Sequence, residues 1–175
     1  MIIRKAVMED LQAVVSIYDE VHSREEAGEV TIGWIRDVYP VRKTAEDSIS
    51  RGDMFVQVDE SGAVTATGII NQLQVDVYAG APWEFEAEDS EVCVFHTLTV
   101  DPDLRGKGIG TRFMAFYEQT AREMGCPELR IDTNARNTNA RALYKKLGYK
   151  EIDIVPTVFN GIPGVNLVLL EKHLG

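Results

Sequence analysis

The stretch that decides the fold reads Leu98-Thr-Val-Asp-Pro-Asp-Leu-Arg-Gly-Lys-Gly-Ile-Gly110. It ends a strand-like apolar run, residues 92–100, and leads into a segment with strong helical periodicity. Glycines between a strand and a helix let the backbone turn with exposed N–H groups, and the helix start adds unpaired N–H donors and the positive end of its dipole. The pattern therefore predicts a loop that binds an anion, most often a phosphate or pyrophosphate, with Arg105 and Lys107 adding full charges.

The glycine spacing selects among the known phosphate-binding loops. A dinucleotide-binding loop reads G-x-G-x-x-G and a Walker loop ends in Gly-Lys-Ser/Thr, and neither order occurs here. Arg105, Gly108 and Gly110 instead form the pattern R-x-x-G-x-G. This segment resembles the pyrophosphate loop of the GNAT superfamily of N-acetyltransferases.

A second motif lies at residues 137–149, after a short predicted strand at 129–133. It reads Asn-Thr-Asn-Ala-Arg-Ala-Leu-Tyr-Lys-Lys-Leu-Gly-Tyr and is similar to the N-x-x-A-x-x-L-Y-x-x-x-G-F/Y segment of the same family. The two motifs stand in the order and separation typical of that family. The resemblance is tight over residues 92–150 and looser elsewhere.

Length and composition indicate one α/β domain over residues 1–175. The chain has 175 residues, of which 45% are hydrophobic, and this suffices for a sizeable core. Periodicity predicts strands at 2–6, 54–58, 64–70, 92–100, 129–133, 149–158 and 165–171, and helices at 11–21, 44–51 (with Thr44 as N-cap), 109–124 and 138–147. Residues 23–43 are irregular, and residues 71–91 either extend the sheet or form an exposed excursion. This order matches the GNAT fold, a mixed sheet of six or seven strands flanked by helices.

Charge and cysteine content set the expected partners. The net charge is −10, yet residues 52–104 hold eleven acidic residues and no lysine or arginine, whereas residues 105–150 hold ten basic and four acidic residues. The basic segment coincides with the two motifs and suits a polyphosphorylated cofactor. An acidic chain without a separate basic face is a poor nucleic-acid binder, and no apolar run is long enough for a membrane span. Two cysteines and the lack of a signal-peptide pattern predict a cytoplasmic protein with reduced thiols.

The resemblance implies acetyl-CoA as acyl donor, bound in a cleft where the strand at 92–100 diverges from the strand at 129–133. The residues implied for the pyrophosphate are Arg105, Gly106, Lys107, Gly108, Gly110 and Thr111. The main chain of Leu98 and Val100 would pair with the pantetheine arm, as a peptide adds to a sheet edge, and Asn137 would position that arm. Tyr144 would assist departure of the CoA thiolate.

The attacking amine must lose a proton, so a base is expected nearby. His96 is the candidate, because alternation along the strand places it on the same face as Leu98. A lone histidine in a strand also commonly has a structural role, and Glu91 and the acids before it are alternative bases. The three histidines lack metal-ligand spacing, so no metal is predicted.

The sequence thus predicts an N-acetyltransferase that moves the acetyl group of acetyl-CoA to the amine of a small molecule or peptide by direct attack. A non-catalytic acyl-CoA sensor on the same fold and a generic nucleotide-binding domain are the alternatives. Residues 23–43, 71–91 and the C-terminal strands would wall the acceptor pocket, with aromatic candidates Trp34, Tyr39, Tyr78, Trp83 and Phe159. The acids of residues 52–104, Glu84, Glu86 and Glu88 among them, either favour a cationic acceptor or only solvate a loop. By resemblance, a second copy in a homodimer is a further partner.

Overall fold

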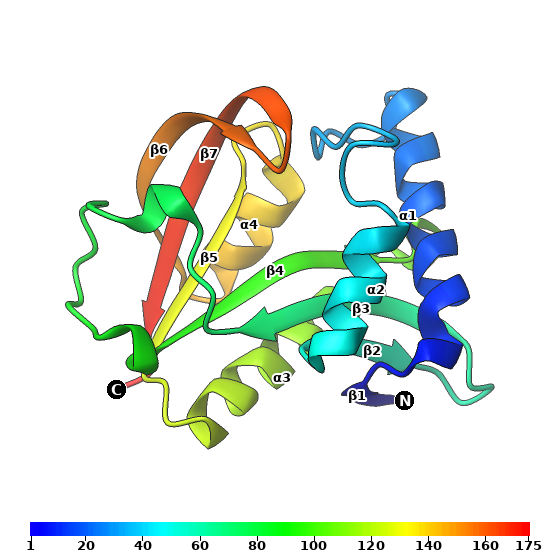
Figure 1. The fold of residues 1–175 in the computed structure, drawn as a ribbon, viewed down its shortest axis with the longest axis horizontal. Helices are drawn as coiled ribbons and strands as arrows, with labels where there is room; N and C mark the ends of the chain where they lie inside the picture. The colour runs from blue at the N-terminus through cyan, green and yellow to red at the C-terminus, as the bar shows by residue number, and fades with distance from the viewer.

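The computed structural model describes residues 1–175 and contains a seven-stranded sheet in the order β1-β2-β3-β4-β5-β7-β6 (Figure 1). The strands are β1 (Ile2–Lys5), β2 (Met54–Val58), β3 (Val64–Asn71), β4 (Val92–Val100), β5 (Glu128–Asn134), β6 (Lys150–Phe159) and β7 (Ile162–His173). Only β4 and β5 are parallel neighbours, and all other pairs are antiparallel. The predicted mixed sheet is confirmed, and β4 takes the central position that its two apolar faces require.

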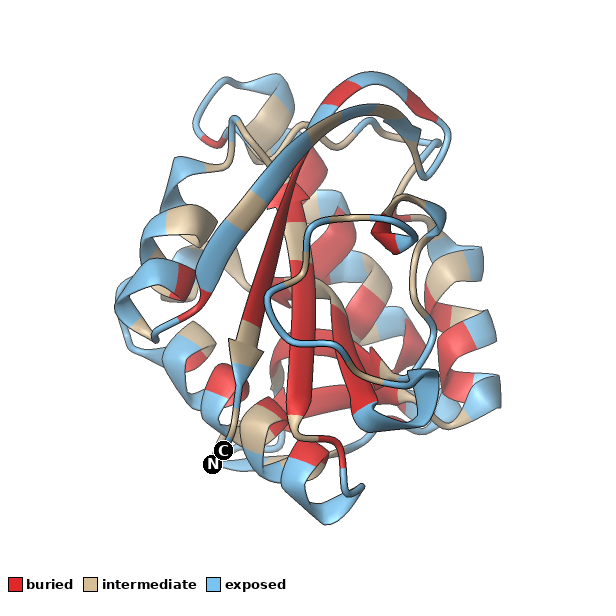
Figure 2. Ribbon diagram, turned by 90° about the vertical axis from the view of Figure 1, so that its left-hand side faces the viewer, coloured by how far each residue is buried: buried red, intermediate tan, exposed pale blue.

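Four α-helices cover the two faces of the sheet: α1 (Leu11–Glu26), α2 (Arg42–Arg51), α3 (Ile109–Glu123) and α4 (Thr138–Lys146). Helices α1 and α2 pack on β2 and β3 from one side, while α3 and α4 contribute to a separate core on the other side. Figure 2 shows the buried residues gathered in the middle strands and the exposed ones on the outer faces of the helices. None of these helices combines the length and the hydropathy needed to cross a bilayer.

Helix α2 begins two residues earlier than the sequence predicted. Val41 is its N-cap residue, and the hydroxyl of Thr44 accepts a 3.1 Å hydrogen bond from the Val41 N–H. Thr44 therefore occupies the third helical position and caps from there, so the prediction of Thr44 as N-cap is wrong. The end of the helix is as predicted, because Gly52 adopts the left-handed conformation that terminates it.

Strands β4 and β5 pair over only the first half of their length. Residues 92–95 pair with residues 128–131, and beyond them the two strands diverge (Figure 1). Strand β5 then continues beside β7, and β4 continues beside β3. The predicted divergence is confirmed, and it leaves the edge of β4 that faces β5 without a hydrogen-bonding neighbour from His96 onward.

A β-bulge lies in β4 at this point of divergence. Residues 67–69 of β3 pair with residues 96–99 of β4, so β4 carries one extra residue, and Thr97 has a φ of 55°. His96 lies opposite Ile69, which belongs to the core under α1 and α2, whereas Leu98 packs against the core under α3. The prediction that His96 and Leu98 share one face is wrong, because a bulge interrupts the two-residue alternation.

Apart from Asn71, the last residue of β3, residues 71–91 form an excursion and add no strand to the sheet. They contain two short 3₁₀ turns, η2 (Asp76–Tyr78) and η3 (Asp89–Glu91). The excursion packs on β5 and β7 through an edge-to-face pair of Tyr78 and Trp83, whose ring centroids lie 5.1 Å apart. The guanidinium of Arg130 on β5 lies 4.2 Å from the Trp83 ring centroid and donates a 2.6 Å hydrogen bond to Gln74, which fixes the excursion to the sheet.

Candidate active site

A cavity of about 1010 Å³ occupies the wedge between β4 and β5. One part of it, the loop end, is lined by the segment between β4 and α3 at residues 104–111. Another part, the aromatic end, is lined by Trp34, Tyr39 and Phe159. Between them the wall includes the diverging strands and residues along the whole length of α4.

The loop end has the geometry of an anion site. Gly106 and Gly108 have φ values of 76° and 73°, and a Cβ atom built on either would meet no other atom within 4 Å. The first hydrogen bond of α3 joins the Arg112 N–H to the Gly108 carbonyl at 3.1 Å, so the N–H groups of residues 109–111 have no partner inside the helix. Two uncrowded glycines therefore lead into unpaired N–H groups at the positive end of a helix dipole, which fits a pyrophosphate.

Most of the residues predicted for this loop line the cavity. They are Arg105, Gly106, Gly108, Gly110 and Thr111. Lys107 is the exception, because its exposed side chain lies outside the cavity wall. Its positive charge is thus available at the rim of the loop and not within the cavity.

The residues predicted to hold an extended ligand arm also line the cavity. Leu98 and Val100 lie on the stretch of β4 that β5 no longer covers. Asn137 is the N-cap of α4, and its Oδ1 accepts a 3.2 Å hydrogen bond from the Ala140 N–H, which leaves its amide Nδ2 free to donate. Asn134 and Asn139 line the same wall, and the sequence patterns did not single them out.

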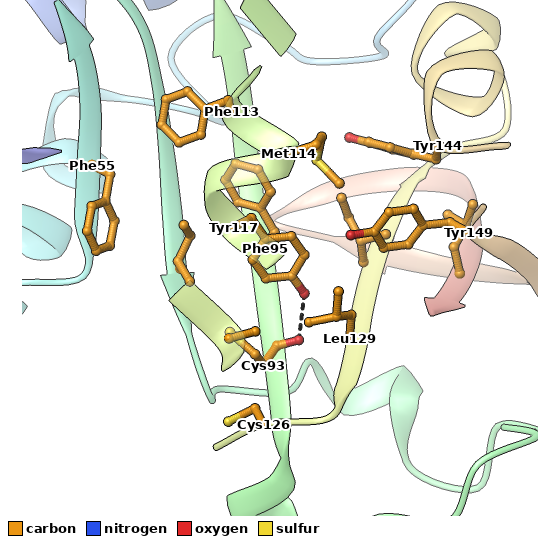
Figure 3. Packing of buried hydrophobic residues seen from close by; sticks show 14 of the residues in the cluster. Phe55, Cys93, Phe95, Phe113, Met114, Tyr117, Cys126, Leu129, Tyr144 and Tyr149 are labelled. Carbon is orange, nitrogen blue, oxygen red and sulfur yellow. Dashed lines mark hydrogen bonds between the residues drawn. The ribbon is translucent and has the colours of Figure 1, made fainter. Parts of the chain in front are cut away.

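Tyr144 lies on α4 with its ring in the main core and its hydroxyl on the cavity side. The ring is 5% exposed and lies 6.1 Å from the ring of Tyr149, beside which it projects in Figure 3. Tyr144 lines the cavity, and its hydroxyl makes no hydrogen bond within the protein. Burial, together with the charge of Asp132, raises the pKa of Tyr144, so the hydroxyl is protonated at neutral pH and available as a donor.

Asp132 on β5 is the residue that sequence reasoning missed. It is half-buried in the cavity wall, has no cationic partner, and accepts a 2.8 Å hydrogen bond from the Tyr78 hydroxyl. Burial raises the pKa of Asp132 to about 7, and the bond from Tyr78 acts in the opposite direction. A carboxyl inside the predicted strand at 129–133 is the sequence signal that could have found it.

His96 also lines the cavity, but its ring is already engaged. Burial lowers the pKa of His96 to about 4, and its Nε2 lies 3.0 Å from Oδ1 of Asn71. That oxygen also accepts the Leu73 N–H, while the Asn71 amide nitrogen donates to Asp53. Since Oδ1 is the acceptor, Nε2 of His96 carries the proton, and only Nδ1 can take up another.

The predicted acidic wall is not part of the cavity. The carboxylates in the cavity wall are Asp47 and Asp132, and none of the eleven acids between residues 52 and 104 lines it. Glu84 pairs with Lys150, and Glu86 and Glu88 are exposed. Of the two interpretations of these acids, the structure supports solvation of an exposed loop, because the excursion turns its acids toward solvent and directs Tyr78 and Val75 inward.

Only some of the aromatic residues predicted for the acceptor pocket line the cavity. Trp34, Tyr39 and Phe159 line the cavity, whereas Tyr78 and Trp83 pack beneath its wall. The Tyr39 hydroxyl is hydrogen-bonded to the Thr97 side chain, which ties residues 32–39 to the bulge of β4. No group of three or more histidine, cysteine or acidic side chains is arranged to hold a metal ion.

Comparison with known proteins adds independent findings. A sequence model described as the acetyltransferase (GNAT) family matches residues 12–149. The uncharacterized N-acetyltransferase MJ1207 of Methanocaldococcus jannaschii is 34% identical over 73 residues, which span 42% of this chain and 32% of that protein. The chain thus matches about a third of the length of this curated relative.

Two solved structures establish the likeness of the fold. An acetyltransferase of the GNAT family from Streptococcus agalactiae superposes with a TM-score of 0.80 at 22% identity, covering 98% of this chain and 94% of that one. The acetyltransferase yncA from Salmonella typhimurium, solved with its cofactor acetyl-CoA, superposes with a TM-score of 0.68 at 18% identity, covering 99% and 94% of the two chains. At these identities the superpositions show a shared fold.

Proposed function

Because the chain belongs to the acetyltransferase (GNAT) family, we propose that it is an acetyl-CoA-dependent N-acetyltransferase that acts on the amine of a small molecule or peptide. One observation carries this proposal. A single cavity joins an anion-binding loop at one end to a half-buried carboxyl and a free tyrosine hydroxyl farther in. A donor that carries phosphates at one end and a thioester at the other fits this arrangement.

The chain's own groups divide the binding of the donor among them. The N–H groups of residues 109–111 and the Arg105 guanidinium would hold the pyrophosphate. The unpaired edge of β4 at Leu98 and Val100, with the free amide nitrogen of Asn137, would hold the pantetheine arm. When bound, acetyl-CoA supplies the activated acetyl group.

Asp132 receives the proton of the attacking amine in this proposal. An ammonium with a pKa of about 10 must be deprotonated before it attacks, and a base with a pKa near the working pH is suited to that step. Asp132, with its pKa raised to about 7, meets this condition. His96 is the weaker base, because its pKa is lowered to about 4 and its Nε2 already carries a proton held by Asn71.

Tyr144 stabilises the leaving sulfur by donating a hydrogen bond. Complete proton transfer from an ordinary tyrosine to a thiolate is uphill by about 2 kcal/mol, since their pKa values lie near ~10 and ~8.5. The raised pKa of Tyr144 makes complete transfer harder still. The hydroxyl therefore acts through a hydrogen bond to the sulfur as charge develops on it.

The proposal is tested with a panel of amines. For each amine, release of the CoA thiol and the mass of the acetylated product are measured. We expect acetyl-CoA to bind in calorimetry and at least one amine to gain an acetyl group. Binding without transfer to any amine would identify an acyl-CoA sensor on the same fold. Absence of acetyl-CoA binding would overturn the assignment of the loop end.

A further inference from the structure

The aromatic end of the cavity has an apolar wall. Trp34 and Tyr39 meet edge to face with ring centroids 6.2 Å apart. Phe159 and Ile162, from the tip of the β6–β7 hairpin, and Val75, from the excursion, complete this wall. These five side chains come from three different connections of the fold, so together they enclose space suited to an aromatic or aliphatic body.

The charges that border this apolar wall leave one carboxyl without a cation. Asp132 is hydrogen-bonded only by the neutral hydroxyl of Tyr78. Asp47, the other carboxylate of the cavity, is paired with Lys43 at 2.9 Å on the exposed side of α2. An approaching ammonium therefore finds a single unpaired carboxyl, Asp132, with which to form an ion pair.

No free cation faces the aromatic end. The Arg51 guanidinium lies in the cavity wall, but its Nε and Nη2 bind the two oxygens of Asp53 at 2.9 and 3.3 Å. The other cations of the wall, Arg105 and Lys146, lie on the glycine loop and at the end of α4. A carboxylate on the acceptor would thus lose water without gaining a partner and would also lie near Asp132.

A second ammonium on the acceptor meets a similar difficulty. If Asp132 binds the reacting amine, the aromatic end offers a second ammonium only uncharged groups, the polar Asn160 and Gln74 among them, and no further carboxylate. An unpaired charge in such surroundings is disfavoured. The arrangement thus discriminates against both amino acids and diamines.

We infer that the acceptor is a primary monoamine on an aromatic or aliphatic body that carries no carboxylate. Its ammonium binds at Asp132, and its body lies against Trp34, Tyr39 and Phe159. The inference rests on the proposed acetyl transfer and specifies the acceptor of that reaction. In the transfer the ammonium first gives one proton to Asp132, and the amine nitrogen then bonds to the acetyl carbon. The carbon–sulfur bond breaks with its electron pair going to the sulfur, and the second proton of the nitrogen passes to that sulfur, so that CoA leaves as the thiol.

Matched acceptor pairs test the inference directly. Phenethylamine and phenylalanine share one ring and differ by a carboxylate, and butylamine and 1,4-diaminobutane differ by a second amine. We expect kcat/KM for each monoamine to exceed that of its partner by about tenfold or more, the size expected when a charge is buried without a partner. Equal or reversed preference in either pair, with acetyl transfer still occurring, would overturn the inference and leave the proposed function intact.

Substitutions in the apolar wall of the aromatic end test the inference independently. Trp34→Ala is expected to raise KM for phenethylamine several-fold while the affinity for acetyl-CoA, measured by calorimetry, stays unchanged. Phe159→Ala, on a separate hairpin, is expected to raise KM for phenethylamine in the same way and replaces the first variant if that one does not fold. The exposed pair Glu86→Gln and Glu88→Gln serves as control, because neither residue lines the cavity. An unchanged KM in a folded Trp34→Ala or Phe159→Ala protein would contradict the placement of the acceptor body, whereas loss of acetyl-CoA binding in the unmodified protein would contradict the proposed function itself.

Discussion

The hydroxyl of Tyr78 donates a 2.8 Å hydrogen bond to Oδ2 of Asp132, across a separation of 54 residues in the chain. Tyr78 belongs to the excursion at 71–91, and Asp132 lies on β5 where that strand leaves β4. The bond stabilises the ionised carboxylate, whereas burial disfavours it, so the two effects together set the pKa of Asp132. The excursion is thereby part of the candidate active site although its own acids face solvent.

The pH dependence of kcat/KM is the first test of this relationship. Asp132 must be ionised to take a proton, so we expect kcat/KM to fall as the pH drops through about 7, the raised pKa of Asp132. Tyr78→Phe removes the bond that lowers this pKa, and the acidic limb should move to higher pH. Tyr149→Phe is the control, because that hydroxyl binds Glu118 away from the cavity. If the acidic limb of the pH profile stays in place in Tyr78→Phe, Asp132 is not the group that takes the amine proton.

A substitution in the glycine loop at residues 106–110 tests whether this loop binds the donor. Gly108→Val places a side chain in the open space before the N–H groups of α3, at a φ of 73° that β-branched residues rarely adopt. We expect the affinity for acetyl-CoA to fall by at least about tenfold, which corresponds to about 1.4 kcal/mol. Gly62→Val in the β2–β3 turn, at a φ of 86° and also in open space, reports the effect of backbone strain alone. Calorimetry that finds equal affinities in the two folded variants would remove the loop from the binding site.

Tyr144→Phe tests the role of the hydroxyl while keeping the ring in the core. We expect kcat to fall by roughly 10²–10⁴-fold, the range of positioned proton donors, with little change in affinity for acetyl-CoA. Tyr149→Phe, in the same cluster and 6.1 Å from the Tyr144 ring, is the matched control for packing (Figure 3). The measurement is single-turnover transfer, so that chemistry limits the rate. An unaltered rate would make Tyr144 a core aromatic only.

Stability should also depend on pH through a buried acid outside the cavity. Glu128 is fully buried between Glu171, Arg130 and His173, and burial together with Glu171 raises its pKa from 4.5 to about 8. The folded state therefore holds a proton that the unfolded state releases between these pH values. This contribution to stability is complete below about pH 4.5 and is lost as the pH rises through about 8.

Glu128→Gln removes this dependence, since the amide does not titrate. We expect its free energy of unfolding at pH 8.5 to exceed that of the unmodified protein by at least about 1 kcal/mol, because one pKa unit corresponds to about 1.4 kcal/mol. Urea denaturation at pH 5.5, 7 and 8.5 measures the effect, and the exposed Glu60→Gln serves as control. Parallel pH profiles for Glu128→Gln and the unmodified protein would show that Glu128 is ionised throughout.

By itself the sequence determined the elements and their order, because these depend on local patterns. Apolar periodicity located the strands and helices to within a few residues, and the glycines of residues 106–110 indicated the anion loop from their position between a strand and a helix. It also located Tyr144 and Asn137, which lie on one short segment with a recognisable motif. The exact start of α2 was missed, because it depends on whether Thr44 or Val41 is the N-cap residue.

Only the tertiary structure decided which side chains meet across the cavity. The bulge at Thr97 separated His96 from Leu98, and no periodicity reveals where a strand gains one residue. Asp132 became the central carboxyl because β4 and β5 diverge beside it and Tyr78 reaches it from a distant segment. The acids of residues 84–91 could line the acceptor pocket or solvate a loop, and only the path of the excursion decided that they face solvent. The burial and the pKa of a side chain depend on the residues packed around it. Packing brings together residues that lie far apart in the chain, so local sequence patterns do not reveal these properties.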